Sequence, residues 1–214
     1  MRSIAKLMKD WQFTGPNGVT TAVELPHTWN AKDGQDGGND YWRGCCTYCT
    51  RFAAPVYDPA QQQVWLQFEG VNASAAVLLN GQQLCTHDGG YSTFRAEVTE
   101  LLQAENQLTV RVDNSVNDRV YPQKADFTFY GGIYRDVSLL VVNKNHIALG
   151  HFGDTGVKIT PALQENSADI RVETLVEGSG TVTVELLDAE GRTAAKGEGE
   201  NTFLHLDAPH LWNG

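Results

Sequence analysis

The sequence is short of positive charge. Its 214 residues include 16 Lys and Arg against 26 Asp and Glu, a formal net charge of −10. Because nucleic-acid phosphates are bound by basic patches, this balance predicts no nucleic-acid partner and favours a neutral ligand. No apolar run approaches the about 18 residues that indicate a membrane helix, so no membrane partner is expected. The N-terminus lacks an apolar stretch with a small-residue cleavage site, and without a visible signal peptide we expect a cytoplasmic protein.

Cysteine is scarce, and the spacing Cys46-x-x-Cys49 is the only one typical of a zinc or redox site. The surrounding sequence RGCCTYCTRF is typical of a strand with Tyr48 and Phe52 on one face. Alternation places Cys46 on that face and Cys49 on the other, so the two thiols cannot hold one metal ion. We therefore predict free thiols, which suit a reducing compartment. The six histidines show no ligand spacing, and no metal site is expected from them.

Helical periodicity is almost absent. The segment QVWLQFE (63–69) alternates apolar and polar residues, as does QLTVRVD (107–113). Asn80-Gly81 lies between two apolar runs and predicts a tight hairpin, because both residues tolerate positive φ. Residues 99–104 are compatible with one helical turn that has Thr99 as its N-cap. Many short strands separated by turns predict an all-β sandwich.

The pattern divides the chain into residues 1–145 and a smaller β unit at 146–214. Strands are expected in the smaller unit at 156–161, 168–176, 181–187 and 192–196. An immunoglobulin-like sandwich needs about 100 residues, so we expect the second unit to be incomplete at its C-terminus.

A long loop between two strands, within residues 113–142, carries many side chains that can bind polar ligands. They are Asn114, Asn117, Asp118, Arg119, Tyr121, Asp126, Phe127 and Tyr130. Function tends to lie on loops that a rigid frame positions. The loop ends at Gly131-Gly132, where the backbone can adopt conformations that other residues resist. We interpret it as the wall of a small-molecule site.

Seven motifs, in order and with matching spacing across residues 11–142, resemble the N-terminal sugar-binding domain of glycoside hydrolase family 2. They are LPHTWN (25–30), DGGNDYWRG (36–44), FEGV (68–71), VLLNG (77–81), GGYSTF (89–94), LTVRVDN (108–114) and GGIYRDVSLL (131–140). This family includes β-galactosidases, β-glucuronidases and β-mannosidases, and DGQDGGNDY (33–41) is most similar to the β-galactosidase branch. Residues 147–212 resemble the family's immunoglobulin-like second domain. The resemblance implies a jelly-roll, galactose-binding-like sandwich followed by a truncated immunoglobulin-like sandwich.

The resemblance also implies that the catalytic glutamates lie elsewhere, on a TIM barrel that follows in the family. Retaining hydrolysis needs two carboxyl groups about 5–5.5 Å apart, and a barrel needs about 250 residues. No motif here matches those glutamates, so we expect no catalytic residue and no activity of this chain alone. The expected role is to shape the sugar-binding rim of a β-galactosidase and to support its barrel. The alternatives are a free-standing carbohydrate-binding module, a β-glucuronidase or β-mannosidase parent, and a structural or homo-oligomer-forming sandwich.

The resemblance assigns the substrate-binding residues. In family β-galactosidases an aspartate at the place of Asp126 bonds the galactose and helps to hold a monovalent cation, so Asp126 is also the expected Na⁺ ligand. Asn39 and Asp40 are expected to reach the same β-galactoside, and Arg119 and Tyr121 to flank the pocket. The structural alternatives are a loop-capping Asp126, a simple turn at Asn39–Asp40, and an Arg119 that bonds its own loop. No other cofactor is expected in this chain, whereas the parent enzyme is expected to use Mg²⁺.

The remaining candidates are interpreted as structural. Trp42, Phe127 and Tyr130 could stack on a sugar, but large aromatic side chains in loops more often pack internally. Arg135-Asp136 is expected to pair at a strand start. Asn72-Ala73-Ser74 matches a glycosylation acceptor but lies in the FEGV turn. Cys45-Cys46-Thr47 stands where the family usually carries an aromatic pair.

Overall fold

The computed structural model describes residues 2–33, 42–122 and 128–211, and they form strands almost throughout. The helical element in these ranges is one 3₁₀ turn, η1 (Thr99–Leu101). None of the helical structure within them is long and apolar enough to cross a membrane. The all-β class predicted from the sequence is confirmed. The chain folds as two compact units, unit 1 (residues 1–143 with 151–153) and unit 2 (144–150 with 154–214).

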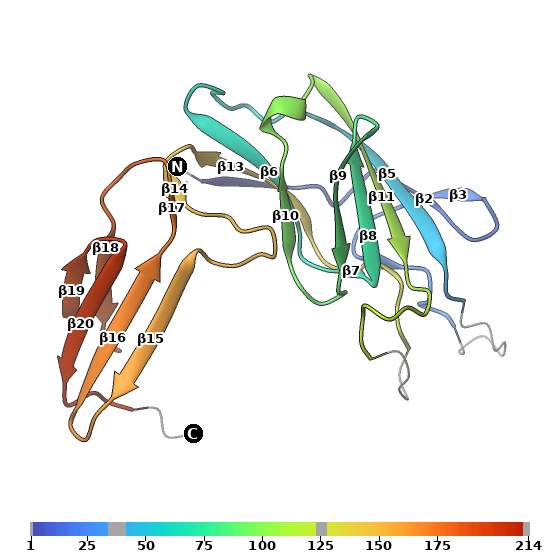
Figure 1. Cartoon of the computed structure of the whole chain (residues 1–214). Coiled ribbons are helices and arrows are strands. Elements are labelled where there is room, and N and C mark those ends of the chain that lie inside the picture. The colour runs from blue at the N-terminus through green and yellow to red at the C-terminus, as the bar shows by residue number, and fades with distance from the viewer. Residues whose placement is uncertain (1, 34–41, 123–127, 212–214) are drawn as a thin grey trace. The chain divides into compact units, whose positions relative to one another are not determined.

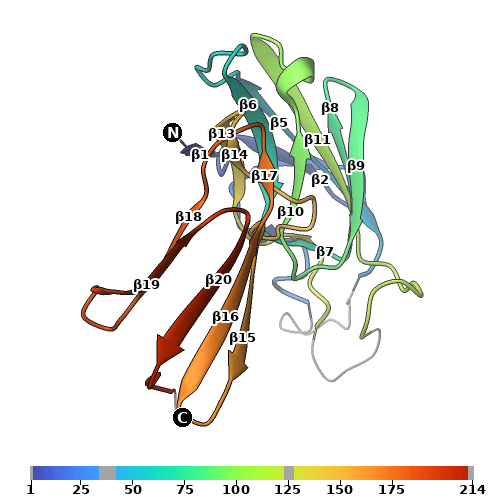
Figure 2. The ribbon, with the colours of Figure 1, turned by 60° about the vertical axis from the view of Figure 1, so that its left-hand side comes forward.

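Unit 1 is a sandwich of two antiparallel sheets (Figures 1 and 2). The four-stranded sheet contains, in spatial order, β1 (Ser3–Lys6), β13 (Val137–Asn143), β6 (Gln62–Phe68) and β10 (Phe94–Glu97). The six-stranded sheet contains β3 (Thr20–Val23), β2 (Trp11–Thr14), β5 (Cys45–Ala53), β11 (Glu105–Asp113), β8 (Ser74–Leu79) and β9 (Gln82–Asp88). A short three-stranded ribbon of β4 (His27–Thr28), β12 (Gly132–Ile133) and β7 (Val71–Asn72) lies beside them.

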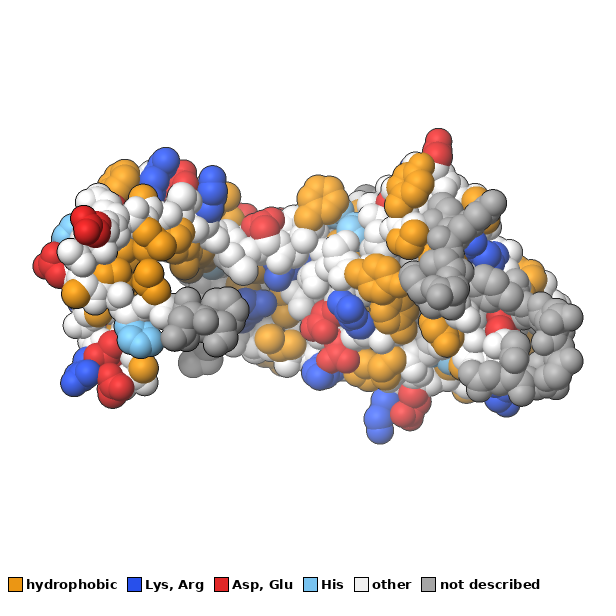
Figure 3. All heavy atoms as spheres, turned by 90° about the horizontal axis from the view of Figure 1, so that it is seen from below, with side chains coloured by type: hydrophobic (Ala, Val, Ile, Leu, Met, Phe, Trp, Pro, Cys, Tyr) orange, Lys and Arg blue, Asp and Glu red, His pale blue; other side chains and the backbone are white. Residues whose placement is uncertain are grey.

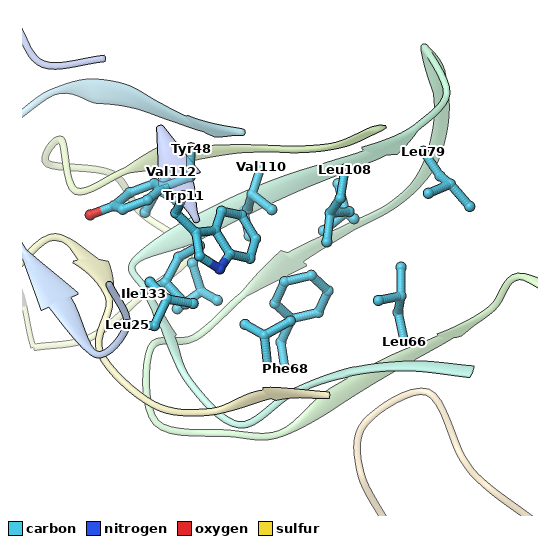
Figure 4. Close-up of a cluster of buried hydrophobic side chains, with 14 of the residues drawn as sticks. Trp11, Leu25, Tyr48, Leu66, Phe68, Leu79, Leu108, Val110, Val112 and Ile133 are labelled. Atoms are coloured by element: carbon cyan, nitrogen blue, oxygen red, sulfur yellow. The ribbon is translucent and has the colours of Figure 1, made fainter. Parts of the chain in front are cut away.

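The core lies between the two large sheets and follows from period-2 alternation. In β11, Leu108, Val110 and Val112 are fully buried, while the residues between them are less so. Leu66 and Phe68 of β6 are equally buried from the opposite sheet, and Figure 4 shows these side chains facing each other. Side chains in a strand point alternately to the two faces, so one apolar set is enough to place each strand. The core makes unit 1 a rigid frame for its loops.

Two further expectations about unit 1 are confirmed. Asn80 and Gly81 have φ values of 52° and 83° and join β8 to β9, as a tight hairpin requires. In β5, Cys46 and Tyr48 are buried together while Cys49 lies on the other face. All four cysteines are free thiols. Burial raises the pKa of Cys46 to about 12, which keeps its thiol protonated and unreactive.

One strand of unit 1 was not predicted, and one local expectation is wrong. The first residues form β1, which pairs with β13 and completes the sheet edge; the sequence pattern there is too short to reveal a strand. Thr99 is not an N-cap, because it is the first residue of η1 and Val98 holds the cap position without a side-chain bond. The Thr99 hydroxyl instead accepts a hydrogen bond from the Val64 amide, which ties η1 to β6.

Unit 2 consists of small antiparallel sheets. They are β14 (His146–Ile147) with β17 (Val176–Glu177), β15 (Val157–Leu163) with β16 (Ser167–Thr174) and β20 (Asn201–Asp207), and β18 (Thr183–Leu187) with β19 (Thr193–Glu198). The expected strands are present, and β20 was not predicted. The immunoglobulin-like assignment of this unit stays a prediction.

One side of unit 2 carries apolar side chains that are left uncovered. Ile159 and Leu163 of β15 lie opposite Val172 and Ala168 of β16, and cross-strand partners share a face of the sheet. Val172 and Ala168 are buried, yet Ile159 is 64% and Leu163 60% exposed. Figure 3 shows hydrophobic side chains gathered on this unit. The core-facing side of β15 is therefore only partly covered.

Matched Leu→Ala substitutions test this exposure. Leu204 lies in the same sheet and is buried, so Leu204→Ala should lower the free energy of unfolding by about 2–4 kcal/mol. Leu163→Ala should cost about 0.5 kcal/mol or less, because its side chain already contacts solvent. Urea titration and hydrogen exchange of the β16 amides measure both. An equal loss in the two variants would show that Leu163 is covered in solution.

Candidate functional site

The site is built on the loops at the end of unit 1 where β11 stops (Figure 1). The ribbon of β4, β12 and β7 joins residues 27–28, 132–133 and 71–72 at the base of these loops. Gly132 of β12 has a φ of 142°, and a Cβ there would lie 2.3 Å from the His27 carbonyl oxygen. Only glycine allows this close approach, so the second residue of the Gly131-Gly132 pair closes the loop as the sequence indicated.

Two buried asparagines join the loops. Asn114 follows β11 directly and is fully buried, and Asn30 follows β4 and is 1% exposed. Asn114 Nδ2 donates to Asn30 Oδ1 at 3.2 Å, across 84 positions of sequence. The same Asn30 oxygen accepts the Gly131 amide at 2.7 Å. Asn114 was expected to be one of the ligand-binding side chains of the loop, and its complete burial shows that this interpretation is wrong.

Each asparagine uses its remaining polar atoms on a neighbouring loop. Asn30 Nδ2 donates to the Trp42 carbonyl at 2.8 Å and to the Asp33 carboxylate. Asn114 Nδ2 donates to the Phe129 carbonyl at 3.0 Å, and Asn114 Oδ1 accepts the Gly44 amide at 2.8 Å. Buried polar atoms are costly unless they are bonded, and here the bonds are satisfied within the protein.

Arg119 is anchored most closely to a strand, and within its own loop it also pairs with Asp118 at 4.0 Å. Its Nε donates to Asp88 Oδ2 of β9 at 2.9 Å, and Ser74 also donates to the Asp88 carboxylate. Burial works to raise the pKa of Asp88, but the bonds from Ser74 and Arg119 outweigh it and hold that pKa below its usual value. The Arg119 charge is therefore matched by a carboxylate, and the pair pins the loop after β11 to the sheet.

Tyr121 is a predicted site residue that the structure describes, and it is 74% exposed. It lines a small pocket with Arg43, Asn72, Tyr91 and Phe129, among others. Arg119 and Tyr121 both lie on the loop that follows β11, and their pocket-flanking role stays a prediction. The other predicted substrate-binding residues, Asn39, Asp40 and Asp126, lie outside the described residues, as does Phe127.

Three of the residues interpreted as structural have partners within the protein. Trp42 packs edge-on against Trp29, with ring centroids 6.0 Å apart. Asn72 is buried and donates to the Tyr130 carbonyl at 2.7 Å, so it is part of the loop base. Asp136 pairs with Lys6 at 2.5 Å.

Arg135 and Asp136 do not pair with each other, which corrects the expectation. Arg135 Nη1 donates to the Tyr91 carbonyl at 3.1 Å and also to the Glu69 carbonyl. No group of three His, Cys, Asp or Glu side chains suited to a metal ion occurs among residues 2–33, 42–122 and 128–211.

Two histidines of unit 1 lie in surroundings that disfavour their charged form. His87 is buried and stacks on Phe94 with ring centroids 4.3 Å apart, and its Nε2 bonds the Ser92 hydroxyl at 3.0 Å. His27 Nδ1 bonds the Tyr48 hydroxyl at 2.7 Å. Burial lowers the pKa of both imidazoles, because the charged form is poorly solvated there.

Comparison with known proteins identifies the family. Residues 35–163 match the family model described as "Glycosyl hydrolase 2 galactose-binding domain-like". The match covers more than half of the chain, which therefore belongs to glycosyl hydrolase family 2, as a galactose-binding-like sandwich of its N-terminal region.

The relatives are named as glycoside hydrolases of two specificities. A β-glucuronidase of Bacteroides fragilis is 32% identical over 97% of this chain, which spans 33% of that protein. A β-galactosidase of Thermoanaerobacter pseudethanolicus is 32% identical over 61% of this chain and 18% of its own. The crystal structure of an FMN-binding β-glucuronidase from Facaelibacterium prausnitzii is 34% identical, with a TM-score of 0.89 over 99% of this chain and 35% of that one. The chain thus spans about a third of the length of such relatives.

The lowered histidine pKa values predict how unit 1 responds to pH. Below the ordinary histidine pKa of about 6.5, the unfolded chain binds protons that folded His27 and His87 exclude. The contribution of these two histidines to the stability of the folded state is therefore complete above that pH. As the pH falls, each residue lowers the free energy of unfolding by at most about 1.4 kcal/mol per pH unit. The thermal midpoint, read by tryptophan fluorescence, should therefore decrease from pH 7.5 to 5.

His87→Gln should weaken this pH dependence, because the glutamine amide replaces the Nε2 bond but does not titrate. His205→Gln is the control, since Asp169 raises the pKa of His205 in unit 2 and gives that residue the opposite sign. A midpoint in His87→Gln that varies with pH as steeply as in the parent chain would contradict the assignment.

Proposed function

We propose that this chain is the N-terminal, non-catalytic part of a family 2 glycoside hydrolase that acts on β-galactosides or β-glucuronides. The observation that carries the proposal is the family match over residues 35–163, joined to relatives of both names. The catalytic carboxylates would lie on a barrel domain that this chain supports. The chain alone is expected to have no hydrolytic activity.

The role of this part would be to complete the sugar-binding rim. Asp126 would accept hydrogen bonds from adjacent sugar hydroxyls and help to hold a monovalent cation, and Asn39 with Asp40 would bond the same sugar. The chemistry of the residues supports this, because carboxylates accept and amides both donate and accept. The exposed Tyr121, on a loop that the Arg119–Asp88 pair anchors, would border the pocket.

The two sugar classes differ in the configuration of the 4-hydroxyl group and in the group that C5 carries. A β-glucuronide carries a carboxylate where a β-galactoside carries a hydroxymethyl group, and a buried carboxylate requires a matching cation. Arg119 is already matched by Asp88, so a uronate would have to be recognised by other cations. The DGQDGGNDY segment favours the galactoside, whereas the B. fragilis and F. prausnitzii relatives favour the glucuronide.

An activity assay tests both parts of the proposal. The enzyme that contains this chain and its catalytic domain should cleave 4-nitrophenyl β-galactoside or β-glucuronide, and the preferred sugar identifies the class. Asp126→Asn should lower kcat/KM for that substrate by about 10- to 100-fold, the effect of losing a charged hydrogen bond. Asp207→Asn, a change of the same type in unit 2 at a side chain 93% exposed, is the control. Cleavage of neither substrate, or equal kinetics for the two variants, would refute the proposal.

A further inference from the structure

A buried amide pair stands at the base of both loops on which the proposed function depends. We propose that Asn30 and Asn114 are positioning residues, which hold the ends of two loops in one arrangement: residues 30–33 and 42–44 of the first, and 114–122 and 128–131 of the second. The ends of the two loops then form one mechanically coupled base. The consequence for catalysis rests on the proposed function, whereas the mechanical coupling of the loops does not.

The two ends of the first loop are joined by hydrogen bonds from the side-chain nitrogen of Asn30. Asn30 Nδ2 donates both to Asp33 Oδ2 and to the Trp42 carbonyl, so residues on the two sides of segment 34–41 meet there. Gly44 is held in both directions, because its amide donates to Asn114 Oδ1 at 2.8 Å and its carbonyl accepts the Asn114 amide at 3.2 Å. The pair therefore closes the base of this loop.

The second loop is attached to the same pair. Asn114 is its first residue, and Phe129 and Gly131 near its end bond to Asn114 Nδ2 and Asn30 Oδ1. The Thr28 hydroxyl adds a bond to the Gly131 carbonyl at 2.7 Å. Both ends of the second loop thus depend on side chains that also hold the first.

The chemistry of the pair suits positioning and not ligand contact. Asn30 uses both hydrogens of its amide and both acceptor sites of its oxygen within the protein. Asn114 is fully buried and bonds through its amide side chain and through both of its backbone groups. Directional bonds in a buried site are satisfied in one geometry, so loss of one partner leaves several groups unpaired.

The chain contains a matched control. Asn106 is also buried at 1% exposure, and it bonds Gln103 and Asn80 through both side-chain atoms. It lies at the start of β11, whereas Asn114 follows the end of the same strand. Asn106→Ala therefore removes an equivalent amide at the opposite end of unit 1.

Hydrogen exchange in this chain tests the coupling. Asn114→Ala should lower the protection of the Gly131 amide by about tenfold or more, the worth of one hydrogen bond, although Asn114 does not bond Gly131. Asn106→Ala should leave Gly131 protection unchanged at matched global stability. Asn114→Ser, which keeps a hydroxyl at this position, should show a smaller change and serves if the alanine variant does not fold. Unchanged Gly131 protection in the variants of Asn114 would overturn the proposal.

Kinetics of the catalytically complete enzyme test the consequence. Asn114→Ala should raise KM by about tenfold with a smaller change in kcat, because sugar-contact residues are misplaced while the catalytic carboxylates are not. Asn106→Ala should leave KM unchanged. If exchange shows the coupling but KM does not move, the positioning role is overturned. If no substrate is cleaved by any form, the proposed function fails while the exchange result still stands.

Discussion

The loop end of unit 1 depends on the hydrogen bond between Asn30 and Asn114. This bond joins two loops whose asparagines are 84 positions apart in sequence, and each asparagine carries further bonds into its neighbours. A buried amide must be bonded or it destabilises the fold, so the network is cooperative. The described ends of the two loops are therefore held together by buried hydrogen bonds at their base.

The sandwich supplies the frame for this base. β11 is paired along its length with β5 and also with β8, and its inner face is fully buried, so Asn114 is delivered to a fixed point at the end of the strand. The Arg119–Asp88 pair then attaches the next part of the loop to the end of β9. Such an end suits a binding rim, because binding residues often lie on loops that a rigid scaffold positions.

Local features could be read from the sequence, and long-range ones could not. Alternation in β5 and β11 and the Asn80-Gly81 turn predicted the strands and the hairpin, since periodicity and turn chemistry act over a few residues. The edge strand β1 was not predicted, because its pairing with β13 is long-range in sequence. Asn114 was predicted to bind a ligand. An asparagine side chain can either bind a ligand or join two loops, and the choice between these roles depends on the position of Asn30, which is distant in sequence. Likewise Arg119 forms an ion pair with Asp88, a partner that no local sequence pattern reveals.

A double-mutant cycle measures the coupling at the centre of this structure. Asn30→Ala, Asn114→Ala and the double variant would be compared by urea titration of the tryptophan fluorescence. If the two amides act as a pair, the double variant loses less stability than the sum of the single variants, by about 0.5–3 kcal/mol. Additivity within about 0.3–0.5 kcal/mol would contradict the pair and, with it, the view that the ends of the two loops are coupled.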